Sequence, residues 1–239
     1  MEQVEKRRYN GHDIATVFHD AGSKKVVIFC HGYRGTSVGP SRFFVIAARK
    51  LAEQGISSLR FDQYGSGNSD GDFFNSSFND WIATTEAIVD DYLQQSYEVG
   101  LFGQSMGGAT VINVASARNV KAVVAWVPDP NVEAFTPPAD GIIEEGGQRI
   151  TANYWQEAYD TQTASKLAAV AAPMYIVQCS DDEYVSAENH QAISVHAQAN
   201  HTVEMFDGHK HSAWTYDQAD KIITKSVTFL VQHMAVSEA

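Results

Sequence analysis

The residues best suited to chemistry in this chain are a serine, a histidine and an aspartate that lie far apart in the sequence. Ser105 stands in the segment "GLFGQSMGG" (100–108), between Gly103 and Gly107. A serine hydroxyl is a poor nucleophile until a neighbouring base accepts its proton, so its chemistry depends on a histidine elsewhere. The pattern Gly-x-Ser-x-Gly has only three fixed residues and arises often by chance. Its meaning therefore depends on the flanking elements and on the partners.

The segments on either side of Ser105 predict a strand, a sharp turn and a helix. "YEVGLFGQS" (97–105) is typical of a buried strand, and "MGGATVINVASA" (106–117) is typical of a helix. A serine at such a junction lies at the carboxyl end of a central strand, where open α/β sheets bind ligands. The helix N-terminus also directs free N–H groups towards it. These features predict a nucleophile elbow at Ser105.

The base is expected in the loop after the last predicted strand. That loop, "FDGHKHSAW" (206–214), carries His209 and His211. The order serine, acid, histidine is the one expected for a chain of this architecture. We favour His211 as the base and keep His209 as the alternative.

The acid is expected after the preceding strand, in "SDDEYVS" (180–186). Asp182 is favoured because Val185, three residues later, supplies an apolar anchor just behind the carboxylate. Asp181 is the expected turn former, and Asp129, which follows an earlier strand, is a distant alternative. The acid would hold the imidazole in the correct tautomer and stabilise its charged form.

Acyl transfer also needs donors for the oxyanion of the tetrahedral intermediate. The backbone N–H of Met106, directly after the nucleophile, is one expected donor. The second is expected in "HGYRG" (31–35), at the backbone N–H of Tyr33. The alternative is that this segment is only a tight turn.

The order of predicted elements indicates an α/β fold. Strands are expected at 4–9, 13–20, 24–32, 56–62, 97–105, 120–128, 173–180 and 201–208. Helices are expected at about 41–54, 79–95, 106–117, 188–199 and 217–233. The first two strands read as a hairpin through Asn10-Gly11. This alternation predicts a mostly parallel central sheet of about eight strands, with helices on both faces.

One segment interrupts the alternation. We expect a single domain, 1–239, in which residues 129–165 form a small lid or cap insertion with short elements of its own, because a structureless loop of that length is uncommon. Aromatic residues in or beside this segment are predicted to line a substrate pocket. They are Trp126, Phe135, Tyr154, Trp155 and Trp214. The alternative is that these rings hold the insertion together.

Composition narrows the partners and the compartment. The net charge of −12 argues against nucleic acid and anionic membranes as partners. No apolar run reaches the ~18–20 residues that span a bilayer. The charged N-terminus does not resemble a signal peptide, and Cys30 and Cys179 are expected to be reduced thiols of a cytoplasmic protein. No cofactor and no metal site are expected; an exposed N-terminal edge strand leaves a homodimer open.

Taken together, these motifs resemble the α/β-hydrolase superfamily and, within it, feruloyl (cinnamoyl) esterase-like serine hydrolases. The matching segments run in the family's order: 31–35, 61–73, 100–109, 180–185 and 208–212. The resemblance implies the triad Ser105, Asp182 and His211, with the Tyr33 and Met106 amides as oxyanion hole. It also implies structural roles in the loop "YGSGNSDG", for Asp62, Gly65, Gly67 and Ser69.

The expected function is therefore hydrolysis of small acyl or aromatic carboxylic esters through an acyl-enzyme. The expected partner is a small-molecule ester. A peptidase, a thioesterase, a lipase or a C–C bond hydrolase would share the triad and stay open as alternatives. A non-catalytic ligand-binding protein is the alternative from another class, and an intact Ser–Asp–His set argues against it.

Overall fold

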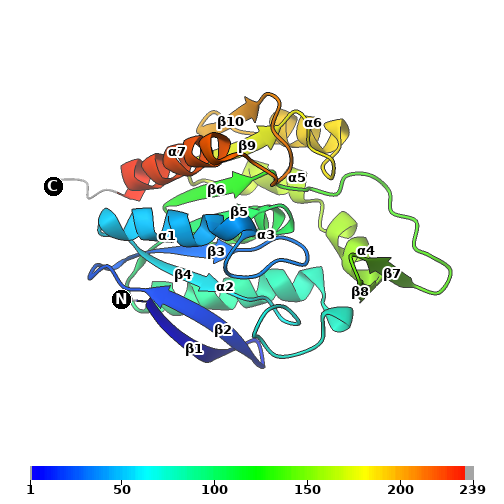
Figure 1. Ribbon diagram of the computed structural model, residues 1–239, viewed down its shortest axis with the longest axis horizontal. Coiled ribbons are helices and arrows are strands. Elements are labelled where there is room, and N and C mark those ends of the chain that lie inside the picture. The colour runs from blue at the N-terminus through cyan, green and yellow to red at the C-terminus, as the bar shows by residue number, and fades with distance from the viewer. Residues whose placement is uncertain (1, 235–239) are drawn as a thin grey trace.

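The computed structural model describes residues 2–234 and shows a central eight-stranded sheet flanked by helices (Figure 1). The order across the sheet is β1-β2-β4-β3-β5-β6-β9-β10. In chain order these strands are β1 (Glu2–Tyr9), β2 (His12–His19), β3 (Lys25–Cys30), β4 (Ser57–Phe61), β5 (Glu98–Gln104), β6 (Ala122–Trp126), β9 (Met174–Cys179) and β10 (His201–Phe206). The predicted fold class is confirmed.

Only the first two strands depart from parallel pairing. β1 pairs antiparallel with β2, and β2 pairs antiparallel with β4, whereas every other neighbouring pair is parallel. The hairpin turn places Asn10 at φ 49° and Gly11 at φ 84°. Positive φ at both central residues is typical of a type I′ turn, which Asn-Gly favours. The predicted N-terminal hairpin is therefore confirmed.

Helices cover both faces of the sheet. On one face lie α1 (Phe43–Glu53) and α7 (Tyr216–Met234); on the other lie α2 (Phe78–Gln94), α3 (Met106–Ala117) and α6 (Ala187–His196). In α1 the buried residues Phe44, Ala47, Ala48 and Leu51 recur at helical spacing, so one stripe faces the sheet. No helix within residues 2–234 is long and apolar enough to cross a bilayer.

Central strands are apolar along their whole length because helices cover both of their faces. In β3 every residue from Val26 to Cys30 is fully buried. Cys30 and Cys179 are free thiols; they are the last residues of β3 and β9, and both are buried. Burial raises the pKa of each thiol to about 12.

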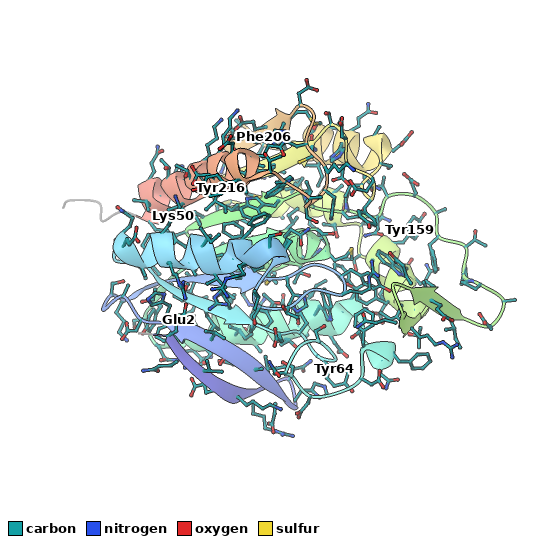
Figure 2. All side chains as sticks on the ribbon, viewed as in Figure 1. Glu2, Lys50, Tyr64, Tyr159, Phe206 and Tyr216 are labelled. Carbon is teal, nitrogen blue, oxygen red and sulfur yellow. The ribbon has the colours of Figure 1, made fainter. Side chains whose placement is uncertain are left out.

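The predicted insertion, residues 129–165, carries short elements between β6 and β9. They are the hairpin β7 (Ile142–Glu145) and β8 (Gln148–Thr151), the helix α4 (Asn153–Asp160) and most of α5 (Thr163–Lys166). β8 packs against the short helix η2 (Phe73–Asn75), and α4 packs against α2. Figure 2 shows Tyr159 of α4 and Lys50 of α1 towards opposite ends of the molecule. The insertion thus lies at the end of the sheet where the parallel strands finish (Figure 1).

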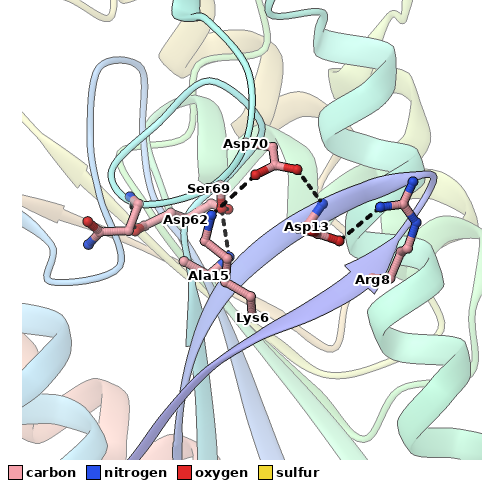
Figure 3. Close-up of polar contacts among 8 residues, drawn as sticks. Lys6, Arg8, Asp13, Ala15, Asp62, Ser69 and Asp70 are labelled. Atoms are coloured by element: carbon pink, nitrogen blue, oxygen red, sulfur yellow. Dashed lines mark hydrogen bonds and ion pairs between the residues drawn. The ribbon is translucent and has the colours of Figure 1, made fainter.

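The loop after β4 is tied to β2 and has a structural role. Ser69 Oγ accepts a hydrogen bond from the backbone N–H of Ala15 at 2.8 Å, and Asp70 Oδ2 accepts one from the N–H of Asp13 at 3.1 Å (Figure 3). Asp62 accepts the N–H of Ser37 at 2.6 Å and so holds the segment that follows β3. These contacts fix loop geometry at a distance from Ser105.

Candidate active site

Ser105 occupies a strained turn between β5 and α3. Its φ of 57° and ψ of −123° lie in a region that residues other than glycine rarely adopt. The neighbouring glycines make the turn possible: a Cβ on Gly103 would lie 2.1 Å from the Gly107 carbonyl oxygen, and a Cβ on Gly107 would lie 2.1 Å from the Cys30 carbonyl oxygen. The predicted strand–turn–helix junction is therefore what the Gly-x-Ser-x-Gly pattern encodes.

His211 and Asp182 form a close pair. His211 Nδ1 lies 2.8 Å from Asp182 Oδ2 and 3.0 Å from Oδ1. The backbone N–H groups of Tyr184 and Val185 donate to Asp182 Oδ1, each at 2.9 Å. Burial opposes ionisation of Asp182, but the hydrogen bond and charge of His211 and the two backbone donors keep its pKa below the ordinary value. The carboxylate can therefore orient the imidazole with Nδ1 protonated.

The alternative residues lie differently. His209 Nδ1 donates to the carbonyl oxygen of Asp207 at 2.7 Å, so its ring is engaged outside the pair. The side chain of Asp181 accepts a hydrogen bond from Ser180 Oγ at 3.0 Å and makes no contact with His211. Asp129 lies at the cavity that contains Ser105 and His211, although it makes no hydrogen bond to the histidine.

Gln104 is a site residue that the sequence analysis did not identify. Its amide Nε2 lies 3.3 Å from His211 Nε2, the nitrogen left free by the Asp182 contact. The side chain is buried and lines the same cavity as Ser105. Gln104 is the first variable residue of the Gly-x-Ser-x-Gly pattern, directly before the serine. That position is the one feature of the sequence that could have indicated a place at the site.

The loop after β3 packs directly on the nucleophile. A Cβ on Gly32 would lie 3.0 Å from Ser105 Cβ and 2.8 Å from Gln104 Oε1, so a larger residue there would press on both side chains. His31 shapes this loop: its Nδ1 donates to the Gly32 carbonyl oxygen at 2.8 Å, and its Nε2 accepts the N–H of Gln63 at 2.9 Å. Burial lowers the pKa of His31, which keeps the ring neutral in this role.

Two backbone N–H groups beside Ser105 are free to donate. Within residues 2–234, neither the N–H of Tyr33 nor that of Met106 has a hydrogen-bond acceptor. Met106 is the first residue of α3, where the helix offers no acceptor of its own. These are the donors predicted for the oxyanion.

The cavity at this site has a volume of about 460 Å³. Ser105 and His211 line it together with the aromatic residues Tyr33, Trp155 and Tyr184. Of the residues predicted to line a substrate pocket, only Trp155 does so. Trp126, Tyr154 and Trp214 are buried in the core instead, and Phe135 is not among the residues that line this cavity.

Packing gives three of these residues a role in the core instead of the pocket. Trp126 is fully buried in the layer between the sheet and α7, where its Nε1 donates to Ser226 Oγ at 2.8 Å. Trp214 stacks on Phe43, and Tyr154 of α4 is fully buried where the insertion packs against α2. The sequence shows that these rings belong near the site, but large rings at a sheet end are also needed as core.

Some charged groups at the cavity have an ion-pair partner and others do not. Arg34 Nη2 pairs with Glu145 Oε1 at 2.9 Å. In the part of the chain that the structure describes, no lysine or arginine pairs with Asp129; its Oδ1 accepts the N–H of Asn131 at 3.1 Å. Burial raises the pKa of Asp129 to about 6, against the opposing effect of that hydrogen bond.

Comparison with known proteins agrees with this geometry. The family described as serine aminopeptidase, S33 matches residues 21–132, which include Ser105 and the loop after β3. No curated protein sequence matches the chain. The sheet order, the strained turn at Ser105 and the family match over residues 21–132 agree with one another, and the predicted α/β-hydrolase fold is confirmed.

Solved structures of the same fold cover nearly the whole chain. Est1E from Butyrivibrio proteoclasticus, with ferulic acid bound, is 22% identical with a TM-score of 0.84, covering 96% of this chain and 98% of its own. The α/β-hydrolase GrgF from Penicillium sp. sh18 is 16% identical with a TM-score of 0.81, covering 99% and 100%. A monoacylglycerol lipase from Paleococcus ferrophilus is 18% identical with a TM-score of 0.76, covering 92% and 99%.

Proposed function

We propose that this protein is a serine hydrolase that cleaves small carboxylic esters through a covalent acyl-enzyme. The observation that carries the proposal is the conjunction of a strained Ser105 with the His211–Asp182 pair at one cavity. Backbone strain of this kind costs about 1–3 kcal/mol and persists where function requires it. A serine that served only as a small turn residue would not need an oriented histidine beside it.

The proposed reaction begins when Ser105 Oγ attacks the ester carbonyl carbon. His211 Nε2 accepts the hydroxyl proton, exchanging its contact with the Gln104 amide for one with Ser105 Oγ, and then gives the proton to the leaving alcohol. Asp182 keeps Nδ1 protonated and stabilises the imidazolium. The N–H groups of Tyr33 and Met106 would donate to the oxyanion. Water, activated by the same histidine, then hydrolyses the acyl-enzyme.

The proposed substrates are esters with a small acyl or an aromatic acid part. A cavity of about 460 Å³ walled by Tyr33, Trp155 and Tyr184 suits a planar ring or a short chain. The ferulic acid bound to Est1E, a protein of the same fold, supports an aromatic acid as one candidate. Carboxylates at Asp129 and Glu145 disfavour strongly anionic esters.

The first test is intact-mass analysis after treatment with a fluorophosphonate, with wild type and Ser105→Ala side by side. We expect one adduct on wild type and none on the variant. Ser105→Ala should also lower the turnover of acetyl, butyryl or feruloyl esters by about 10⁴–10⁶-fold. Near-normal ester hydrolysis by Ser105→Ala would refute the proposal.

Two histidine variants form a matched pair for the same assay. His211→Ala should lose turnover to a similar extent as Ser105→Ala, since the base is gone. His209→Ala should retain it, because that ring contacts the Asp207 carbonyl oxygen instead of the triad. The reverse result would assign the base to His209.

A further inference from the structure

The insertion contacts the two residues whose N–H groups are the proposed donors to the oxyanion, Tyr33 and Met106. Met106 is 1% exposed, and its side chain lies in a hydrophobic cluster with Ile150 of β8 and Tyr154 of α4. Tyr33, from the loop after β3, packs against the same cluster. Two segments that are far apart in the sequence therefore meet through side chains of the insertion.

Tyr33 is held by aromatic rings on several sides. Its ring centroid lies 4.9 Å from that of Trp155, 5.6 Å from Tyr154 and 5.2 Å from Phe73. Two of these three rings come from α4 in the insertion. The backbone of Tyr33 lies in a loop outside the helices and strands. Packing of its ring is therefore what restrains the position of this residue.

Tyr154 is the central member of the cluster. It is fully buried, and its ring lies 5.4 Å from Trp81 and 5.9 Å from Phe78 of α2. Among residues 2–234 the hydroxyl has no hydrogen-bond partner, so the ring makes the contacts of this side chain. Tyr154 thus connects the rigid α2 helix to Tyr33.

A polar contact ties the next residue of the loop to the insertion. Arg34 pairs with Glu145 at the end of β7, and its guanidinium lies over Gly146, where a Cβ would come within 1.6 Å of Nη1. Arg34 also lies 5.6 Å above the ring of Tyr33. A partly exposed ion pair of this kind contributes little stability, but it restrains the direction of the loop.

The geometry points to the insertion as the device that positions the oxyanion hole: Tyr154 and Ile150 fix the side chains of Tyr33 and Met106, and thereby the direction of both N–H groups. This inference rests on the proposed function. It makes Tyr154 and Ile150 positioning residues that do not touch the substrate. A donor displaced by about 1 Å can cost 10²-fold in rate, so loss of this packing should act on catalysis.

The test compares Tyr154→Leu and Ile150→Ala with wild type on the best ester substrate. We expect kcat to fall about 10- to 100-fold while KM changes less than about threefold. A trifluoromethyl ketone that carries the same acyl group forms an anionic tetrahedral adduct, and its inhibition constant should rise by a similar factor. Tyr154→Phe keeps the ring and removes only the unpartnered hydroxyl, so it should stay within about twofold of wild type.

Leu51→Ala serves as a control for destabilisation, because Leu51 is fully buried in α1 on the opposite face of the sheet. It should lose stability but not kcat, measured below its unfolding transition. If Tyr154→Leu and Ile150→Ala match Leu51→Ala in kcat and in inhibitor affinity, the inference is overturned. If Tyr154→Leu does not fold, Ile150→Ala decides alone. An inactive wild type that takes no fluorophosphonate would instead refute the proposed function.

Discussion

Replacing Ser105 by glycine should make the protein more stable than replacing it by alanine, although both variants lose the hydroxyl. At φ 57° and ψ −123° a side chain at this position is strained by about 1–3 kcal/mol. Alanine keeps that strain, whereas glycine relieves it and loses about 0.4–1 kcal/mol through the greater freedom of the unfolded chain. The free energy of unfolding should therefore be about 1 kcal/mol higher for Ser105→Gly than for Ser105→Ala.

The backbone at Ser105 cannot relax instead, because hydrogen bonds hold it on both sides. Its N–H donates to the Trp126 carbonyl oxygen at 2.9 Å, and its carbonyl oxygen accepts the N–H of Ala109 at 3.0 Å. Urea unfolding of both variants measures the free-energy difference directly. In thermal unfolding it corresponds to about 2–4 °C for a chain of this size. A glycine variant less stable than the alanine variant would contradict the assignment of strain to this turn.

Two further variants test the energetics around the site. Asp129→Asn should stabilise the protein above pH 6 by at most about 3 kcal/mol, because the raised pKa of about 6 means that the ionised carboxylate is penalised in the folded state. The gain should vanish as the pH falls towards 4, where Asp129 is protonated in the folded protein; an equal gain at pH 4 and pH 8 in urea unfolding would disprove this. Ser226→Ala should cost about 1–3 kcal/mol of stability with unchanged ester turnover, because it leaves the buried Trp126 N–H without an acceptor. A loss of stability below about 0.5 kcal/mol would contradict this, because the Trp126 N–H would then have found another acceptor.

Much of the fold is predictable from the sequence because its determinants are local. Fully apolar runs such as β3 and β5 occur where helices cover both faces of a parallel sheet. The Asn10-Gly11 turn requires positive φ at both residues, which few other pairs tolerate. The insertion is less predictable: β7 and β8 have four residues each and little apolar pattern, and β8 packs against η2, which lies far away in the sequence.

In the candidate site, too, some residues can be predicted from the sequence and others cannot. Ser105 is marked by its glycines, and the loops that carry Asp182 and His211 are marked by the order of elements. The aromatic residues are not, because a tryptophan such as Trp126 has the same sequence signature in a core as in a pocket. The contact of Gln104 with His211 Nε2 is not predictable in this way, because it forms only when the end of β5 meets the loop after β10.

The burial of both thiols has a practical consequence. Cys30 and Cys179 are inaccessible, and with a pKa of about 12 each remains protonated at neutral pH. Thiolates are the reactive form, so maleimide reagents should leave the native protein unlabelled. A single cysteine introduced at the exposed Gln148, the first residue of β8, would then carry a fluorophore without a cysteine-free background. Fluorescence from that position would report movement of the insertion during turnover.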